Sequence, residues 1–283
     1  MNCKLCKSDS NKIFSGKILN KYKIDYFKCQ NCGFIQTEEP FWLKESYSSV
    51  IAMTDIGLVS RNLSFQNITV WIIKSYFNCK AKFIDFAGGY GLFVRLMRDK
   101  GLDFYRQDFY CKNFFAQYFD VTNQNSTEKY ELLTAFEVFE HLSNPIEEIE
   151  KMFDFSNSIF FSTELQPSIK IETANDWRYF ALETGQHISF YNIKSLEIIA
   201  EKLNCYFYSN GNNLHILTKC ELPTNPFEEW QSINKKPLVV KVLYKVIRYL
   251  ENMMGKEKKE IYLENLLEKD YNMVIEKIKN NVN

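Results

Sequence analysis

A short apolar stretch that ends in an acid and runs into closely spaced glycines constrains the fold of this chain most. Residues 83–86 read Phe-Ile-Asp-Phe, residues 87–91 read Ala-Gly-Gly-Tyr-Gly, and a helical pattern of apolar residues follows. Glycine has no Cβ, so it lets the chain bend sharply and lets a ligand approach the backbone. An acid at the carboxyl end of a strand lies where open parallel sheets bind ligands. The stretch therefore predicts a strand, a binding loop and a helix.

The glycine spacing separates two classes of ligand. A dinucleotide site has the pattern G-x-G-x-x-G, in which the third glycine packs the helix against the sheet near a pyrophosphate. Counting from Gly89 and Gly91, the third position is Val94. The loop therefore favours an adenosine ligand without a phosphate and disfavours an NAD enzyme.

Strand and helix signals alternate from residue 81 to residue 220. A final apolar pair flanks a loop that contains Gly211, which predicts an antiparallel hairpin. Alternation of this kind predicts βαβ units and a parallel sheet. The expected strands are 81–86, 103–108, 130–136, 157–163, 205–208 and 214–217, and the expected helices are 91–100, 145–154 and 192–203.

On these residues the chain resembles the class I S-adenosylmethionine-dependent methyltransferases, whose first motif has the form D-x-G-x-G-x-G. The segment from Asp85 to Gly91 matches it, with Ala87 in place of the first glycine. The resemblance covers roughly residues 41–220 and implies an α/β fold with a Rossmann-like sheet that ends in an antiparallel hairpin. It also implies that S-adenosylmethionine is the cofactor and that Asp85, Ala87, Gly89 and Gly91 contact it.

Further acids are candidate cofactor ligands. We expect Asp85 to orient the methionine end of the cofactor, directly or through water. Asp108 lies 17 residues after Gly91, where a carboxylate can accept hydrogen bonds from both ribose hydroxyls. Asp103 is the alternative if the second strand is shorter. Glu137 follows the strand expected at 130–136, in a run that resembles the family's E-V-x-E-H signature, and we expect it to line the cleft.

A helical connector before the sheet offers a cation. Arg61 is a candidate to bind the cofactor carboxylate, because guanidinium pairs well with carboxylates. Tyr47, Asp55 and Asn62 lie in the same connector and could close over the cofactor with it. The alternative is a helix with a solvated polar face.

His187 is the candidate catalytic base, because a histidine of near-neutral pKa can remove a proton as the methyl group arrives. Its segment resembles the E-H-x-x-Y-F stretch of the sugar C-methyltransferases, with Gln186 in place of the glutamate. That resemblance implies that Tyr179 and Tyr191 touch the substrate. The alternative for His187 is a residue that fixes the turn before the next helix. His141, next to Glu140, is the second candidate for direct chemistry, and His215, inside the hairpin, is expected to be structural.

Two C-x-x-C pairs predict a metal site at the N-terminus. Cys3 and Cys6 are separated by 22 residues from Cys29 and Cys32, and such pairs let four thiolates converge on one tetrahedral zinc ion. Four cysteines leave no open position on the ion, so we expect the zinc to be structural. Such a module before a methyltransferase domain looks like the sugar C-methyltransferases that act on nucleotide-linked deoxysugars. The other four cysteines lack metal-site spacing.

Charge and hydropathy limit the partners. The chain has 35 basic and 35 acidic residues, so no electrostatic footprint for nucleic acid is present. The first residues have no apolar core of a secretory signal, and no run of 18 apolar residues predicts a membrane span. We expect a cytoplasmic enzyme that acts on a small molecule.

The sequence predicts four parts along the chain. They are a zinc-ribbon module (1–40), a helical connector or lid (41–78), the S-adenosylmethionine-binding methyltransferase domain (79–221) and a helical C-terminal extension (222–283). Pro223 and Pro226 are expected to break the chain before two amphipathic helices, near 238–250 and 261–278. The first helix carries Lys241, Lys245 and Arg248, which leaves membrane-surface contact, packing on its own domain, or a homodimer open.

These observations together predict methyl transfer to a small polar acceptor, and by resemblance a nucleotide-linked sugar or another surface-glycan precursor. The alternative acceptors are a phosphate- or phosphoramidate-type group and other metabolites. The alternative of another class is a catalytically inactive fold whose zinc ribbon serves as a binding module.

Overall fold

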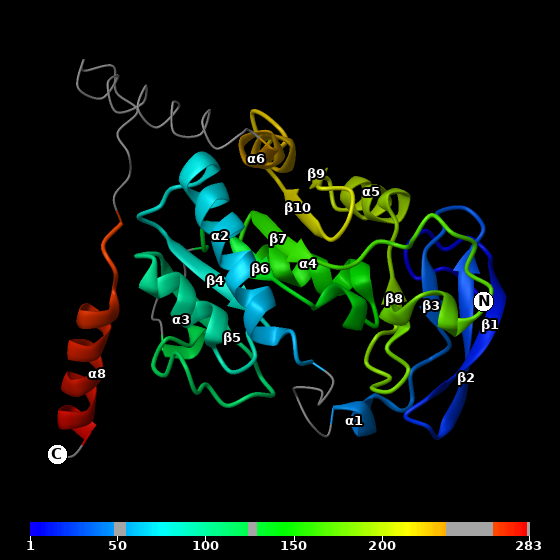
Figure 1. The fold of residues 1–283 in the computed structure, drawn as a ribbon, viewed down its shortest axis with the longest axis horizontal. Helices are drawn as coiled ribbons and strands as arrows, with labels where there is room; N and C mark the ends of the chain where they lie inside the picture. Colours follow the sequence, from blue (N-terminus) through cyan, green and yellow to red (C-terminus); the bar gives the residue numbers. More distant parts are fainter. Residues whose placement is uncertain (48–54, 124–128, 236–262, 282–283) are drawn as a thin grey trace.

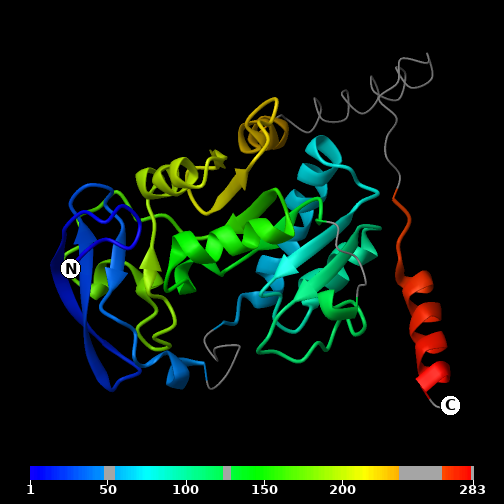
Figure 2. The same ribbon diagram turned by 180° about the vertical axis from the view of Figure 1, so that it is seen from behind.

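The structure is a computed structural model that describes residues 1–47, 55–123, 129–235 and 263–281. It contains two sheets, a small one built mainly from the N-terminal residues and a larger one flanked by helices (Figure 1). Seen from behind, the two sheets again lie side by side, with α8 on the far side of the larger one (Figure 2).

The larger sheet has the α/β topology that the alternating signals predict. Its strand order is β5-β4-β6-β7-β10-β9; the first four strands are parallel, and β10 runs antiparallel to both of its neighbours. The predicted closing hairpin is therefore confirmed. β6 is shorter than expected, because Tyr130 makes only an isolated bridge with Ser156. The strands are β4 (Lys82–Phe86), β5 (Asp103–Gln107), β6 (Leu133–Ala135), β7 (Ser158–Ser162), β9 (Tyr206–Ser209) and β10 (Leu214–Thr218).

Helices cover both faces of this sheet. Side chains alternate across a strand, so Ile84 packs on the face covered by α4 and α5, and Phe83 packs on the face covered by α2, α3 and α6. Asn192 caps α5 together with Ser195, whereas at the start of α4 the Asn144 N–H donates to Glu148. The helices are α2 (Leu58–Tyr76), α3 (Leu92–Asp99), α4 (Pro145–Phe155), α5 (Ile193–Lys202) and α6 (Pro226–Lys235).

The small sheet is completed by a strand that lies about 150 residues further along the chain, as the bounds of β3 and β8 show. β1 (Ser10–Ile18), β2 (Tyr22–Cys29) and β3 (Ile35–Thr37) form an antiparallel meander, and β8 (Ser189–Phe190) pairs with β3. The segment between β7 and α5 thus folds onto the N-terminal sheet. Its aromatic side chains Trp177, Phe180 and Phe190 share one core with Tyr26 of β2. The segment that contains His187 is held between the two sheets as a result.

Short helices lie in the connections between the main elements. α1 (Leu43–Ser46) follows the small sheet, and the one-turn 3-10 helices are η1 (Val121–Asn123), η2 (Phe139–His141), η3 (Ala174–Asp176) and η4 (Arg178–Phe180).

The C-terminal helix is anchored to α3, one of the helices on the larger sheet, by a buried carboxylate. α8 (Leu267–Asn281) carries Asp270, whose carboxylate accepts hydrogen bonds from Arg95 and Arg98 of α3 at 2.8 Å. The second predicted C-terminal helix is thereby confirmed over part of its length, and the first, near 238–250, lies outside the described residues. Pro226 begins α6 rather than breaking the chain, because proline fits the first helical position. Among the described helices, none combines the length and apolarity needed to cross a bilayer.

Candidate active site

The acid–glycine loop at the carboxyl end of β4 is held by a buried carboxylate. Asp85 is 4% exposed, and its Oδ1 accepts a hydrogen bond of 2.7 Å from the Thr134 hydroxyl of β6. Burial, with a smaller contribution from the charge of Asp108, raises the pKa of Asp85 to about 7. A Cβ at Gly88 would stand 2.6 Å from Asp85 Oδ2, so the loop can cross the carboxylate only with glycine at that position.

The loop turns through left-handed backbone and opens onto free space. Ala87, Gly89 and Gly91 have φ of 53°, 53° and 84°, and Gly91 begins α3. A Cβ added at Gly89 would have no atom of the described residues within 4 Å. A ligand can therefore approach the backbone at Gly89 without meeting another described residue.

Asp108 joins the loop after β5 to this glycine loop. Its Oδ2 accepts the Gly89 N–H at 3.0 Å, and its Oδ1 accepts the N–H groups of Tyr110 and Cys111 at 2.8 Å. Both lone pairs of Oδ1 are thus used and Oδ2 keeps one. The predicted contact with the ribose hydroxyls remains a prediction. Asp103 lies at the amino end of β5, paired with Arg98, which rules it out as the alternative.

Glu137 lies beside the loop, at the carboxyl end of β6. Its backbone is left-handed, with φ of 57°, and its Oε1 accepts a hydrogen bond of 2.6 Å from the Ser162 hydroxyl. Its Oε2 lies 3.7 Å from Nε of Arg61, which also pairs with Asp55 at 2.8 Å. Arg61 is thus held at the cleft by two carboxylates, and binding a cofactor carboxylate requires it to exchange one of them.

Two histidines from distant segments meet beside Glu140. The rings of His141 and His187 have centroids 5.0 Å apart at an interplanar angle of 85°. Nδ1 of His141 lies 3.0 Å from the Gln186 carbonyl oxygen, and Nδ1 of His187 lies 2.6 Å from that of Tyr179. Burial lowers the pKa of His141 to about 4 and that of His187 to about 3. Both imidazoles are therefore neutral near pH 7. A carbonyl can only accept, so we place the proton of each ring on Nδ1, where the Tyr47 hydroxyl also lies 3.0 Å from that of His141, and each Nε2 then has a free lone pair.

The two tyrosines predicted to touch the substrate differ in position. The Tyr179 ring lies against His187, with centroids 4.6 Å apart, and its hydroxyl is 3.4 Å from that of Thr163. Tyr191 is fully buried, stacks near Phe34 and donates its hydroxyl proton to the Phe139 carbonyl at 2.9 Å. The prediction for Tyr191 is therefore wrong, because its hydroxyl is committed inside the core.

Glu140 is a residue of the site whose importance the sequence did not reveal. Its side chain is fully buried, and among the described residues neither carboxylate oxygen has a hydrogen-bond partner. Burial, together with the charge of Glu137, raises the pKa of Glu140 to about 8, and the nearby hydroxyls of Tyr179 and Thr163 act in the opposite direction. The available signal was the E-x-x-E-H run, in which the second glutamate adjoins His141.

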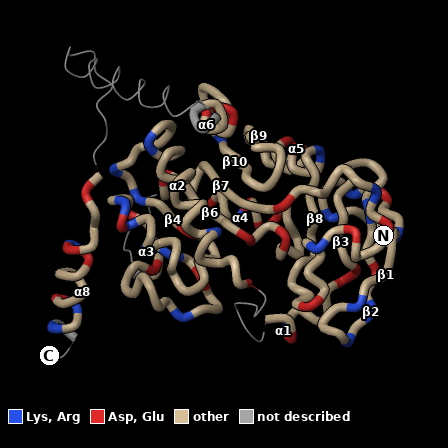
Figure 3. The backbone as a smooth tube through the Cα atoms, in the orientation of Figure 1, with Lys and Arg blue, Asp and Glu red and all other residues tan. Residues whose placement is uncertain are grey.

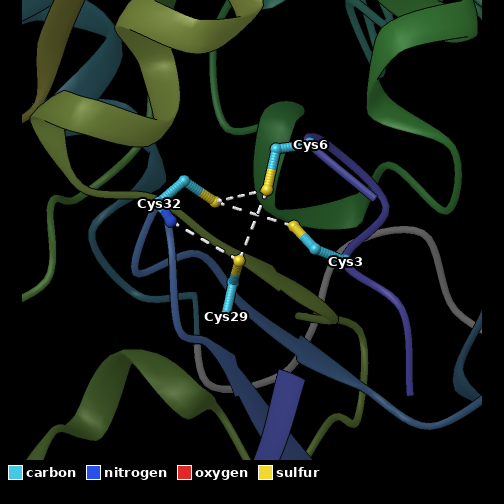
Figure 4. A group of neighbouring side chains, drawn as sticks. All are labelled: Cys3, Cys6, Cys29 and Cys32. Carbon is cyan, nitrogen blue, oxygen red and sulfur yellow. Dashed lines mark hydrogen bonds between the residues drawn. The ribbon is translucent and has the colours of Figure 1, made fainter. Parts of the chain in front are cut away.

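The four N-terminal cysteines converge as their spacing predicts (Figure 4). Their sulfurs lie within 4.8 Å of one another, with Cys3–Cys32 at 3.6 Å, Cys6–Cys29 at 3.4 Å and Cys6–Cys32 at 3.7 Å. Thiolates around a tetrahedral zinc ion, each about 2.3 Å from the metal, are roughly 3.8 Å apart. The donor set and its spacing therefore fit zinc.

Comparison with known families identifies the domain that carries this cleft. A family profile described as a methyltransferase domain matches residues 72–210, which include β4 to β9 and the whole acid–glycine loop. The protein is an S-adenosylmethionine-dependent methyltransferase.

The methyltransferase also has distant likenesses among solved structures. The plantazolicin methyltransferase BpumL, in complex with a monoazolic desmethylPZN analogue and SAH, is 13% identical, with a TM-score of 0.42 over 63% of this chain and 93% of that one. An O-methyltransferase family protein from Burkholderia thailandensis is 12% identical, with a TM-score of 0.39 over 64% and 68%. No curated protein matches the chain. Because each TM-score is below 0.5, the assignment rests on the family profile and the cleft.

Charge on the methyltransferase is mixed. Lys and Arg are interspersed with Asp and Glu along the described chain (Figure 3). A surface of this kind produces little long-range steering of a charged substrate. Recognition of the acceptor therefore depends on the residues of the cleft itself.

Proposed function

We propose that the methyltransferase moves the methyl group of S-adenosylmethionine to a small polar acceptor that binds beside His141 and His187. The observation that carries the proposal is that the glycine loop and the Glu137–His141 run follow the carboxyl ends of the neighbouring parallel strands β4 and β6, with the His187 ring packed on His141. The bound cofactor supplies an electrophilic methyl group on a sulfonium. Positioning the acceptor in line with that group supplies much of the rate enhancement.

The residues around the loop have distinct tasks in this proposal. Asp85 and Arg61 orient the methionine end of the cofactor, Asp108 accepts the ribose hydroxyls, and Glu137 lines the cleft. What supports these roles is position: Asp85, Asp108 and Glu137 lie at the carboxyl ends of β4, β5 and β6, Asp108 bonds to Gly89, and Arg61 of α2 pairs with Glu137.

His187 is the proposed base. Burial lowers its pKa to about 3, below the near-neutral value expected from the sequence, so it is a weak base that accepts the proton in concert with methyl transfer. Its Nδ1–H is fixed by the Tyr179 carbonyl, so the lone pair on Nε2 can accept a proton from the acceptor. As that proton leaves, the acceptor's electron pair forms the bond to the methyl carbon. The bond from carbon to sulfur breaks with its electron pair on sulfur, which leaves a neutral thioether, and His187 is left as imidazolium.

We infer a nucleotide-linked sugar or another surface-glycan precursor as the acceptor. Support comes from the resemblance to sugar C-methyltransferases at the N-terminal cysteines and around His187, where Tyr179 offers a hydroxyl and an aromatic face. The zinc ion held by Cys3, Cys6, Cys29 and Cys32 is structural in this proposal, since four thiolates occupy all tetrahedral positions. A cytoplasmic location and self-association remain predictions.

Calorimetry on zinc-loaded protein tests the cofactor site. Gly89→Ala places a methyl group in the free space, so we expect at least a tenfold loss of S-adenosylmethionine affinity. Gly211→Ala is the matched control, because Gly211 also has positive φ and no described atom within 4 Å of its added Cβ, but lies in the hairpin loop. Absence of S-adenosylmethionine binding to the wild type would favour an inactive binding module.

The acceptor is tested with labelled S-adenosylmethionine and a panel of nucleotide sugars, with methyl incorporation read by mass spectrometry. Methylation of one sugar supports the substrate class. Cofactor binding without methylation of any member of the panel contradicts it and leaves the cofactor site intact.

A further inference from the structure

Glu140, His141 and His187 form a second cluster of metal-binding side chains, separate from the cysteines. One carboxylate oxygen and one nitrogen of each imidazole lie within 4.8 Å of one another. Nitrogen ligands of a tetrahedral ion, each about 2.1 Å from the metal, are roughly 3.4 Å apart. Rotations of the three side chains that move the ligand atoms by about 1 Å therefore bring them to ligand spacing. Glu140 and His141 come from η2, and His187 comes from the segment that folds onto the small sheet.

The carboxylate of Glu140 has no partner that explains its burial. It is 0% exposed, and neither of its oxygens makes a hydrogen bond within the described part of the chain. An unpartnered buried carboxylate is strongly unfavourable, and such groups in proteins are ordinarily paired with a cation or bound to a metal. None of the salt bridges of the described residues includes Glu140, so its side chain is either protonated, as its raised pKa allows, or paired with a bound cation.

Both histidines are prepared as ligands. A metal-binding histidine almost always donates its other ring N–H to a carboxylate or backbone carbonyl, which fixes the ring and the tautomer. The Gln186 carbonyl does this for His141 and the Tyr179 carbonyl does it for His187. In each ring the free Nε2 is left to bind the ion.

We propose that Glu140, His141 and His187 bind a divalent transition-metal ion at the edge of the cofactor cleft. Two imidazoles and one carboxylate suit Zn²⁺, Fe²⁺, Mn²⁺ or Co²⁺ rather than a soft monovalent ion. Three protein ligands leave at least one position open, as in catalytic rather than structural sites. The cluster thus differs in kind from the closed set of four cysteines.

The role of the ion rests on the proposed function. An acceptor oxygen bound at the open position has its pKa lowered by the ion and loses its proton to solvent. The oxygen lone pair then forms the bond to the methyl carbon, and the bond to sulfur breaks with its electrons on sulfur. His187 serves as a ligand in this arrangement, and the ion replaces it as the means of activating the acceptor.

Cobalt titration of the full chain tests the site without any methyl transfer. Cobalt bound by four cysteines gives intense sulfur-to-metal bands, whereas cobalt bound by nitrogen and oxygen gives only weak visible bands. We expect the wild type to bind two Co²⁺ per chain, one of each kind. Glu140→Gln and His187→Gln are expected to bind one, with the sulfur bands intact, which also reports that the small sheet is folded.

Glu147→Gln is the matched control, since Glu147 is exposed on the first turn of α4, and it is expected to bind two ions. A wild type that binds only the thiolate-ligated ion overturns the proposal. A second ion that persists in both site variants also overturns it, as an adventitious surface ion.

Cofactor binding and turnover separate this inference from the proposed function. Glu140→Gln is expected to keep its S-adenosylmethionine affinity within about threefold, so a lost cobalt site with normal cofactor binding supports the metal. Once an acceptor is known, Glu140→Gln is expected to lower turnover at least tenfold. Normal turnover in Glu140→Gln with loss only in His187→Gln contradicts the metal and supports a simple base.

Discussion

The cysteine cluster and the cleft of this methyltransferase differ in how their polar groups are paired and buried. In the cluster, four sulfurs face one another and are embedded in an apolar core that continues to α4 and α5. In the cleft, Ala87 and Glu137 have left-handed backbone, Asp85 is buried with a raised pKa, and Glu140 has no partner among the described residues. Strained and unsatisfied groups persist only where the surrounding structure holds them, and they gather at functional sites. The cysteine cluster therefore stabilises the fold, and the strained and unpartnered groups of the cleft lower the free energy of unfolding.

Removing one cysteine of the cluster is expected to change stability most. Cys29→Ser removes a ligand that is 3% exposed and accepts the Cys32 N–H. Because a structural zinc contributes on the order of 10 kcal/mol to folding, we expect a loss of roughly 5 kcal/mol in the free energy of unfolding. Metal content and chemical unfolding measure the effect.

Cys220→Ser is the control, because Cys220 is exposed and lies outside the cluster. It should retain both zinc and stability. If Cys29→Ser were as stable as this control, the cluster would not be the stabilising region.

The same contrast explains what could be read from the sequence. The cysteine cluster and the glycine loop are encoded by local spacing, and the sheet is encoded by alternating signals, so each was predicted. The meeting of His187 with Glu140 and His141 depends on a long segment that folds back onto the small sheet through β8. No spacing rule encodes such a contact, and for the same reason Tyr191 was assigned to the substrate although it fills the core between the sheets.

Glu140→Gln is expected to act in the opposite direction from the cysteine variant. The amide keeps the shape of the side chain and is neutral without taking up a proton, whereas the buried carboxyl, with its pKa raised to about 8, must be protonated at pH 7. In protein freed of metal at this site we therefore expect a gain of about 2 kcal/mol in unfolding free energy at pH 7. Unfolding in urea with and without added Co²⁺ measures it. Added ion should stabilise the wild type more than the variant, and a variant that is less stable in both conditions would refute the contrast.

Asp85→Asn sharpens the comparison, because Asp85 is buried like Glu140 but accepts a hydrogen bond from Thr134. Its pKa is raised to about 7, so between the unfolded-state pKa near 4 and pH 7 the folded protein holds a proton that the unfolded chain has lost. Wild-type stability therefore falls as pH rises through that window. The variant lacks this loss, and its advantage should grow by about 1–2 kcal/mol between pH 5.5 and pH 8.

Urea unfolding at the two pH values gives the measurement, and Asp154→Asn on the exposed side of α4 is the control. A pH-independent difference between Asp85→Asn and wild type would mean that the carboxylate is not desolvated in the folded protein. If the more stable variant binds S-adenosylmethionine more weakly, the Asp85 carboxylate contributes to cofactor binding.

Ala87→Gly is expected to have the smallest effect. Ala87 has φ of 53°, a conformation that costs a residue with a Cβ about 1–2 kcal/mol and costs glycine little. Glycine also gains entropy in the unfolded chain, so we expect a net stabilisation of about 0.5–1 kcal/mol in urea unfolding. Ala81→Gly, just before β4 and without positive φ, should lose a similar amount. Equal effects at both positions would remove Ala87 from the strained groups of the cleft, whereas stabilisation at Ala87 with unchanged cofactor affinity would show that the strain there is tolerated rather than used.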